Sequence, residues 1–160
     1  MAQSEPVAES MGISRRPLTP EWSIELDDSF VARVIDGELR MLSMGPPVRT
    51  IWFIVWCTPE EPHTDTLNRI MDNAHPSPKE RFIEVGADED EVRYGSWYPS
   101  TVSGHHQWGL YGYTMRHGSY VQAAFLTDEE SDRDWALAAW RSLRYAGPVG
   151  GNRSAGGGLG

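Results

Sequence analysis

The chain has 160 residues and a formal net charge of −9, from 23 acidic and 14 basic residues. This length suits one domain with a substantial core and is short for two. An acidic surface repels nucleic-acid phosphates and anionic lipid headgroups, so we expect no nucleic acid and no membrane as partners. The longest apolar run, residues 51–57, is far shorter than the roughly 20 residues of a membrane-spanning helix.

The two ends of the chain differ in composition from its middle. Residues 1–20 are polar and lack the apolar stretch of a secretory signal, and residues 146–160 are rich in glycine. We expect a flexible N-terminal arm over residues 1–20, one domain over residues 21–145 and a disordered tail after it. The one cysteine, Cys57, lies in an apolar segment that we expect to be buried, which favours a reducing compartment and a cytoplasmic protein.

A β-hairpin and a longer strand are predicted at the start of the domain. Residues 30–35 and 39–44 have the pattern of strands, and Asp36-Gly37 between them suits a type I′ turn, which needs positive φ at both central positions. Residues 49–57 are apolar at both alternating sets of positions. We therefore expect a central strand that is covered on both faces.

A helix is predicted after this strand. Thr58, Pro59 and Glu61 match an N-cap, a proline at the first helical position and a capping-box glutamate. Pro62 interrupts the pattern, so a start at Thr64 is the alternative. The apolar stripe recurs at helical spacing: Leu67, Ile70, Met71 and Ala74.

The remaining elements are strands and a final helix. Residues 81–85 and 92–98 are predicted strands, the second closed by Pro99-Ser100, and residues 106–115 and 120–127 form a hairpin. If Met115 pairs with Tyr120, then Leu110 faces Phe125. The segment 128–131, which begins with three acidic residues, favours the start of a helix, with apolar positions at Trp135, Leu137, Ala139, Trp140 and Leu143. These elements predict an α+β domain: one antiparallel sheet of about six to seven strands with two helices packed on it.

Motifs for catalysis or metal binding are missing from the sequence. His63 and His75 are twelve residues apart, roughly 18 Å on a helix, and no cysteine pair or His-Glu-x-x-His pattern occurs. No glycine-rich phosphate loop and no nucleophile motif is present. We expect no metal and no cofactor.

One face of the last hairpin is the candidate site. It carries tyrosine ring bodies with hydroxyl tips beside small residues, and such a face on a concave sheet can line a ligand cavity. The alternative is a structural face covered by the helix stripe. We call the side of the sheet that bears Tyr111 and Tyr113 the tyrosine face. The residues expected at the site, some from neighbouring strands, are Tyr111, Tyr113, Tyr120, Gln122, Trp97, Arg93 and His105.

The order of elements resembles the PsbP-like α/β/α fold. The matching segments are residues 22–26, the hairpin at Asp36-Gly37, residues 49–57 and residues 107–143. That superfamily includes an extrinsic photosystem II subunit, a Ran-binding nuclear import factor and many small bacterial proteins. The resemblance implies a non-enzymatic binding or assembly protein, and no functional residue is carried over from it. The usage of Gly, Ala, Arg and Trp resembles that of actinobacterial proteins.

We therefore expect a small acidic, tryptophan-rich bacterial protein that is a non-catalytic binding or accessory protein acting through a protein partner. The alternative is a small cofactor-free enzyme, of the cyclase or isomerase kind, or a carrier, with a small hydrophobic ligand on the tyrosine face. Such an enzyme works mainly by holding its substrate in a reactive geometry. His105 or Glu84 is then the candidate general base.

Overall fold

The computed structural model describes residues 12–86, 90–116 and 118–146. Its centre is a large antiparallel sheet with the strand order β3-β4-β5-β9-β8-β7-β6. The strands of this sheet are β3 (Val31–Ile35), β4 (Glu38–Ser43), β5 (Arg49–Thr58), β6 (Glu80–Val85), β7 (Val92–Val102), β8 (His105–Arg116) and β9 (Gly118–Thr127). A smaller sheet, of order β1-β2-β10, contains β1 (Ile13–Pro17), β2 (Trp22–Asp27) and β10 (Arg144–Tyr145).

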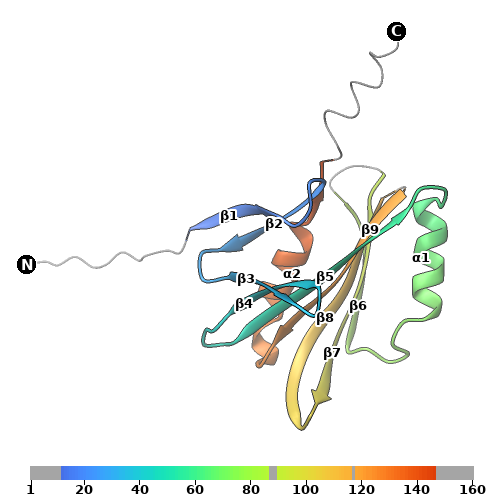
Figure 1. Ribbon diagram of the computed structural model, residues 1–160. Helices are drawn as coiled ribbons and strands as arrows, with labels where there is room; N and C mark the ends of the chain where they lie inside the picture. The colour runs from blue at the N-terminus through green and yellow to red at the C-terminus, as the bar shows by residue number, and fades with distance from the viewer. Residues whose placement is uncertain (1–11, 87–89, 117, 147–160) are drawn as a thin grey trace, which may run out of the picture.

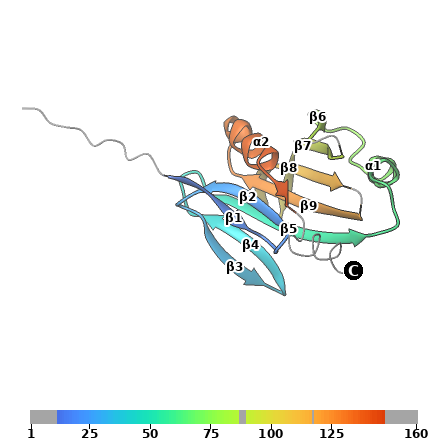
Figure 2. The same cartoon turned by 90° about the horizontal axis from the view of Figure 1, so that it is seen from above.

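Two helices cover opposite sides of the large sheet (Figure 1). Helix α2 (Arg133–Arg141), which follows the 3₁₀ turn Glu130–Asp132, packs on β8, β9 and β2. Helix α1 (His63–Asp72) packs on β7 and β8 from the other side. Seen from above, the small sheet lies on the same side as α2, and the β3–β4 hairpin extends away from α1 (Figure 2). The predicted α+β class, with two helices on an antiparallel sheet, is confirmed, and the smaller sheet was not predicted.

The turn and register predictions for the two hairpins are confirmed. Asp36 and Gly37 both have positive φ, 54° and 82°, between β3 and β4. Met115 pairs with Tyr120, so that Leu110 lies opposite Phe125. Both hairpins are local, so turn chemistry and the two-residue period suffice to set them.

The core lies between the large sheet and α2. Trp140 of α2 is fully buried, and its indole lies over Gly95 of β7 and Gly112 of β8, which pair with each other. A Cβ atom at Gly112 would stand only 2.5 Å from Trp140 Nε1. The two glycines therefore form a slot that lets the indole of Trp140 approach the sheet backbone.

Strand β5 is covered on one face only, which corrects the expectation of a strand covered on both. Ile51 and Phe53 are buried toward α2, whereas Trp56, on the opposite face, is 44% exposed. Cys57 is exposed, not buried as predicted. Trp56 is exposed because α1 packs on β7 and β8 and leaves the β5 side of that face open. Cys57 lies on the other face, that of Ile51 and Phe53, near the end of β5, where it is exposed although Ile51 and Phe53 are buried.

Helix α1 begins at His63, and both predicted starts, at Pro59 and Thr64, differ from this. Thr58 is still in β5, where it pairs with Gly118 of β9, so it cannot cap a helix. Pro62 is the N-cap residue instead. Strand pairing has overridden a local capping pattern.

Strand β7 continues through Pro99 to Val102, although the sequence predicts that Pro99-Ser100 ends it. Strand β6 begins at Glu80, opposite Trp97, so the residues of β7 after Trp97 have a strand neighbour on the β8 side only. A proline is tolerated there because it breaks no hydrogen-bond ladder on the free edge.

Part of the segment assigned to the N-terminal arm is a strand. Residues of β1 pair with β2, and Arg15 Nη1 donates to Ser142 O at 2.9 Å. Arg16 donates to the carbonyl oxygens of Phe30 and Asp27, both at 2.7 Å. Residues 1–11 of the predicted arm and residues 147–160 of the predicted tail lie outside the described residues.

Candidate binding site

The tyrosine face is built by strand alternation across β5, β9, β8 and β7. Tyr111 of β8 pairs with Ala124 of β9 and Ser96 of β7, and Ala124 pairs with Trp52 of β5. Paired residues in an antiparallel sheet present their side chains on the same face. The register therefore brings side chains from four strands to one surface, opposite to α2.

Helix α1 covers only one end of this face. Ile70 of α1 is buried in a cluster with Tyr94, Met115 and Tyr120, and Tyr113 packs against this cluster while partly exposed. Tyr111 lies outside the cluster and remains partly exposed. Both alternatives for the tyrosine face therefore apply, each to one part of it: a structural end under α1 and an accessible part beside it.

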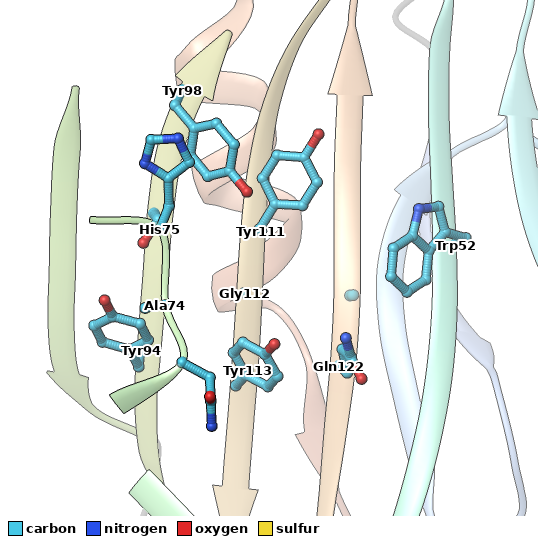
Figure 3. Close-up of a pocket in the computed structure, with 12 residues that line it drawn as sticks. Trp52, Ala74, His75, Tyr94, Tyr98, Tyr111, Gly112, Tyr113 and Gln122 are labelled. Carbon is cyan, nitrogen blue, oxygen red and sulfur yellow. The ribbon is translucent and has the colours of Figure 1, made fainter. Parts of the chain in front are cut away.

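A cavity of about 230 Å³ lies beside the covered end (Figure 3). Tyr98 and Tyr111 stand on one side of it and Tyr94 and Tyr113 on the other, with Trp52 across the sheet. Its lining residues are Trp52, Asn73, Ala74, His75, Tyr94, Ser96, Tyr98, Tyr111, Gly112, Tyr113, Gln122 and Ala123. Gly112 and Ala123 direct no side chain to this face, so their backbone forms the floor.

Aromatic stacking holds one wall of the cavity in place. The ring of Tyr98 lies between the rings of His75 and Tyr111, with centroid distances of 4.1 and 4.6 Å. The ring of Tyr111 also lies over Gly109: a Cβ atom at Gly109 would stand 2.8 Å from Tyr111 Cε2. The missing side chain at Gly109 lets this ring tilt away from Gly112, which leaves the space above the floor open.

The cavity lining contains no acidic side chain, lysine or arginine among the described residues. Burial raises the pKa of Tyr98 to about 12, with smaller contributions from Tyr111 and Tyr113. Burial also raises the pKa of Tyr113. His75 is held by a hydrogen bond, since its Nδ1 accepts from the Ser77 N–H at 3.0 Å.

One hydroxyl at the cavity has no partner. Ser96 is 3% exposed, and its Oγ finds no hydrogen-bond partner among the residues that the structure describes. Two other polar groups of the cavity have partners. Tyr111 Oη lies 3.3 Å from Ser100 Oγ, and Gln122 Oε1 accepts from Trp56 Nε1 at 3.0 Å.

Four of the residues expected at the site share the tyrosine face. Tyr111, Tyr113 and Gln122 line the cavity, and Tyr120 lies next to them under α1. The ring of Tyr120 is buried, with centroids 6.3 Å from Tyr113 and 6.1 Å from Trp56.

The other three expected residues lie elsewhere, which corrects their placement. Trp97 is buried on the α2 side, stacked on Trp108, and Arg93 on the same side donates to Arg141 O at 3.1 Å. Both occupy odd positions of β7, whereas the even positions face the cavity. His105 is exposed at the start of β8, where its Nε2 lies 2.9 Å from Asp128 Oδ1.

Trp52, Ser96, Tyr98 and His75 line the cavity but were not among the expected site residues. Two of them could have been predicted from the sequence. Once β7 and β8 are paired so that Ser96 lies opposite Tyr111, strand alternation places Ser96 and Tyr98 on the same face as Tyr111. No local signal exists for His75, which reaches the sheet through the path of the chain after α1.

Within the described ranges, no three His, Cys, Asp or Glu side chains are grouped so as to hold a metal ion. In the same part of the chain, no helix has the length and apolar character needed to cross a membrane.

Comparison with known proteins identifies the fold. No family model and no curated protein sequence matches the chain. Among solved structures, the chain is similar to the solution structure of cyanobacterial PsbP (CyanoP) from Synechocystis sp. PCC 6803, with a TM-score of 0.58 and 12% sequence identity. The match covers 89% of this chain and 98% of that one. The chain therefore has a PsbP-like fold, as the order of its elements predicts.

Proposed function

We propose that the protein is a non-catalytic binding protein that receives part of a partner protein in the cavity of the tyrosine face. The observation that carries the proposal is the cavity itself: it is walled by aromatic rings, partly exposed and free of charged lining residues. Aromatic side chains of this kind are enriched at the centres of protein interfaces. The PsbP-like fold is compatible with an accessory role of this kind.

The residues around the cavity favour binding over catalysis. The two candidate general bases are both outside it. Glu84 pairs with Arg93 in the sheet register and accepts from Arg141 at 2.6 Å, on the α2 side, and His105 is at the far end of β8. His75 is the one imidazole that lines the cavity, and its Nδ1 is already engaged with the backbone.

The surface beside the cavity favours a protein over a small hydrophobic molecule. Along β5, Trp52, Ile54 and Trp56 all lie on the tyrosine face and all are at least partly exposed. A small ligand would fill the cavity and leave this apolar strip in water. A partner that spans both would remove the whole strip from water, which is favourable at about 25 cal/mol per Å² of apolar surface.

We also propose that the protein works in the cytoplasm of a bacterium. The exposed thiol of Cys57 supports this, because a free accessible cysteine is best tolerated in a reducing compartment.

Site-specific photo-crosslinking tests the function. A photoreactive phenylalanine analogue is placed at Tyr111, and at Ala138 as the control, since Ala138 is an exposed residue of α2 on the opposite side of the sheet. In a lysate of the host, we expect the Tyr111 position alone to give a discrete protein adduct. Excess wild-type protein should compete for that adduct, and a Trp52→Ala/Tyr98→Ala variant should not.

Equal adducts at both positions, or competition by the double variant, would count against the tyrosine face as the docking surface. A low-mass adduct at Tyr111 without a protein adduct would favour the carrier alternative.

A further inference from the structure

We propose that the outer edge of β3 binds an extended segment of another protein by strand addition, and that this segment carries an acidic residue between apolar ones. The edge lies at the end of the large sheet away from α1 (Figure 2), so this site is distinct from the cavity of the tyrosine face. Three features carry the proposal: free backbone groups, an unpaired arginine and a groove beside the strand.

The free backbone groups of the edge belong to Ala32 and Val34. Strand β3 is an edge strand of the large sheet, and no described strand pairs with its outer side. In a hairpin with a two-residue turn, the residues that flank the turn, here Ile35 and Glu38, exchange both backbone hydrogen bonds, and the bonded pairs then recur at every second residue. The N–H and C=O groups of Ala32 and Val34 therefore point away from β4, where an added strand finds two donors and two acceptors.

Arg33, between these two residues, selects the charge of the added strand. Its side chain is exposed on the face of Trp52, since Arg33 pairs with Arg40 and Arg40 pairs with Trp52. It has no hydrogen bond or ion pair with another described residue. When an antiparallel strand bonds to Ala32 and Val34, its residue opposite Arg33 occupies a non-hydrogen-bonded position, where facing side chains lie closest. An acidic residue at that position forms a cross-strand ion pair with Arg33.

The other positions of the added strand meet apolar surface. The residue before the acidic one lies opposite Val34, which is 72% exposed, and the second residue after it lies opposite Val31, which is 49% exposed. Val31 and Arg33 also line a groove of about 480 Å³, to which Leu42 and Met44 contribute further apolar surface. An aliphatic or aromatic side chain opposite Val31 therefore has a groove beside it to enter.

A second copy of this chain fits the edge poorly. Pairing of two β3 edges about Arg33 puts two arginines directly opposite each other, which is destabilising. Pairing about Ala32 needs the backbone of Phe30, whose N–H and carbonyl oxygen are already hydrogen-bonded within the chain. Pairing about Val34 runs into the turn at Asp36 and leaves one hydrogen-bonded pair. The edge thus resists its own copy and accepts a strand of opposite charge.

Blocked hexapeptides added to the isotope-labelled 160-residue chain test the proposal. The probe is acetyl-Ser-Val-Glu-Val-Leu-Ser-amide, and its binding is followed by NMR shifts of the Ala32 and Val34 amides. We expect about 2- to 5-fold weaker binding when glutamine replaces the glutamate of the probe, the range of one cross-strand ion pair.

N-methylated probes report the hydrogen bonds of the added strand. The N–H groups of both valines of the probe face β3, so N-methylation of either should weaken binding about 5- to 10-fold, as the loss of one net hydrogen bond does. The N–H of the glutamate points away from β3, so its N-methylation should change the affinity by less than about 2-fold.

Charge reversal on the protein supplies the second comparison. In Arg33→Glu, the order of the probes should invert, so that a probe with lysine in place of glutamate binds best. Arg144→Glu is the matched control, because it changes the net charge equally at an exposed residue of β10 in the small sheet. This control should keep the wild-type order of the probes.

Equal affinities of the glutamate and glutamine probes for the wild type would overturn the proposal, as would equal losses from N-methylation at glutamate and at valine. No shift of the Ala32 and Val34 amides at about 5 mM probe, above a millimolar Kd, would also overturn it. Neither the probes nor the variants alter the cavity, so failure here leaves the proposed function standing, and failure of the crosslinking at Tyr111 leaves the β3 edge standing.

Discussion

The slot beneath Trp140 allows a stability prediction that the structure makes quantitative. A Cβ atom at Gly112 would stand 2.5 Å from Trp140 Nε1 and 2.9 Å from Trp140 Cδ1, closer than such atoms approach. Gly112→Ala therefore forces the indole or the strand to move, and overpacking of this kind costs about 1–3 kcal/mol of unfolding free energy. Trp140→Ala empties the slot and should cost about 3–5 kcal/mol, because Trp140 is fully buried.

The double variant isolates the contact. With Trp140 replaced by Ala, the new methyl group at Gly112 meets no ring, and Gly→Ala should then stabilise by about 0.4–1 kcal/mol through the unfolded chain. The effect of Gly112→Ala should thus differ between the two backgrounds by roughly 1.4 to 4 kcal/mol. Urea denaturation followed by far-UV circular dichroism measures all four proteins, since its main signal comes from the backbone that they share.

Gly109→Ala is the matched control on the same strand. Its Cβ atom would meet the ends of the Tyr111 and Leu126 side chains at 2.8 Å, on the face away from Trp140. Its effect should add to that of Trp140→Ala within about 0.5 kcal/mol. If Gly112→Ala is equally additive with Trp140→Ala, the slot does not limit the packing of α2, and the reasoning fails.

Three further predictions concern the tyrosine face and its surroundings. Tyr113→Ala should cost about 2 kcal/mol of unfolding free energy, because Tyr113 packs against the buried cluster around Ile70 of α1. Tyr111→Ala, outside that cluster, should cost about 1 kcal/mol or less. Equal costs for the two variants in urea denaturation would contradict the division of the tyrosine face into a covered and an accessible part. Because the folded pKa of Tyr98 is about 12, above the unfolded value of about 10, its contribution to stability is complete below pH 10 and is lost as the pH rises toward 12. Tyr98→Phe should remove the highest step in the absorbance titration of tyrosinate and weaken this pH dependence of unfolding; an unchanged titration would place the high pKa elsewhere. Cys57 should react with a thiol reagent in the native protein as fast as in denaturant, and protection in the native state would show that it is covered.

Much of the fold follows from local features of the sequence. Asp36-Gly37 supplies the backbone conformation that a tight hairpin needs, and alternation in β8 and β9 fixes the pairing of Met115 with Tyr120. These features act between residues that are close in the chain, so they are readable without tertiary structure. The same period predicts that Tyr111 and Tyr113 share a face.

The tertiary structure decided how much of that face stays accessible. The length of α1 and its stripe do not reveal that it covers β7 and β8 and leaves Trp56 exposed, because this depends on how β5 and the chain after Thr58 run. Strand pairing with Gly118 also removed Thr58 from its predicted cap. A local preference worth about 1 kcal/mol yields to a ladder of many hydrogen bonds and side-chain contacts.

The cavity itself is a product of distant segments. Trp52, Ser96 and His75 come from β5, from β7 and from the chain after α1, and the sequence separations between them carry no periodic signal. The sequence alone determined the local hairpins and the tyrosine side chains, since both rest on short-range geometry. Only the folded chain decided which of those tyrosines line the cavity and stay partly exposed, since that outcome depends on long-range packing.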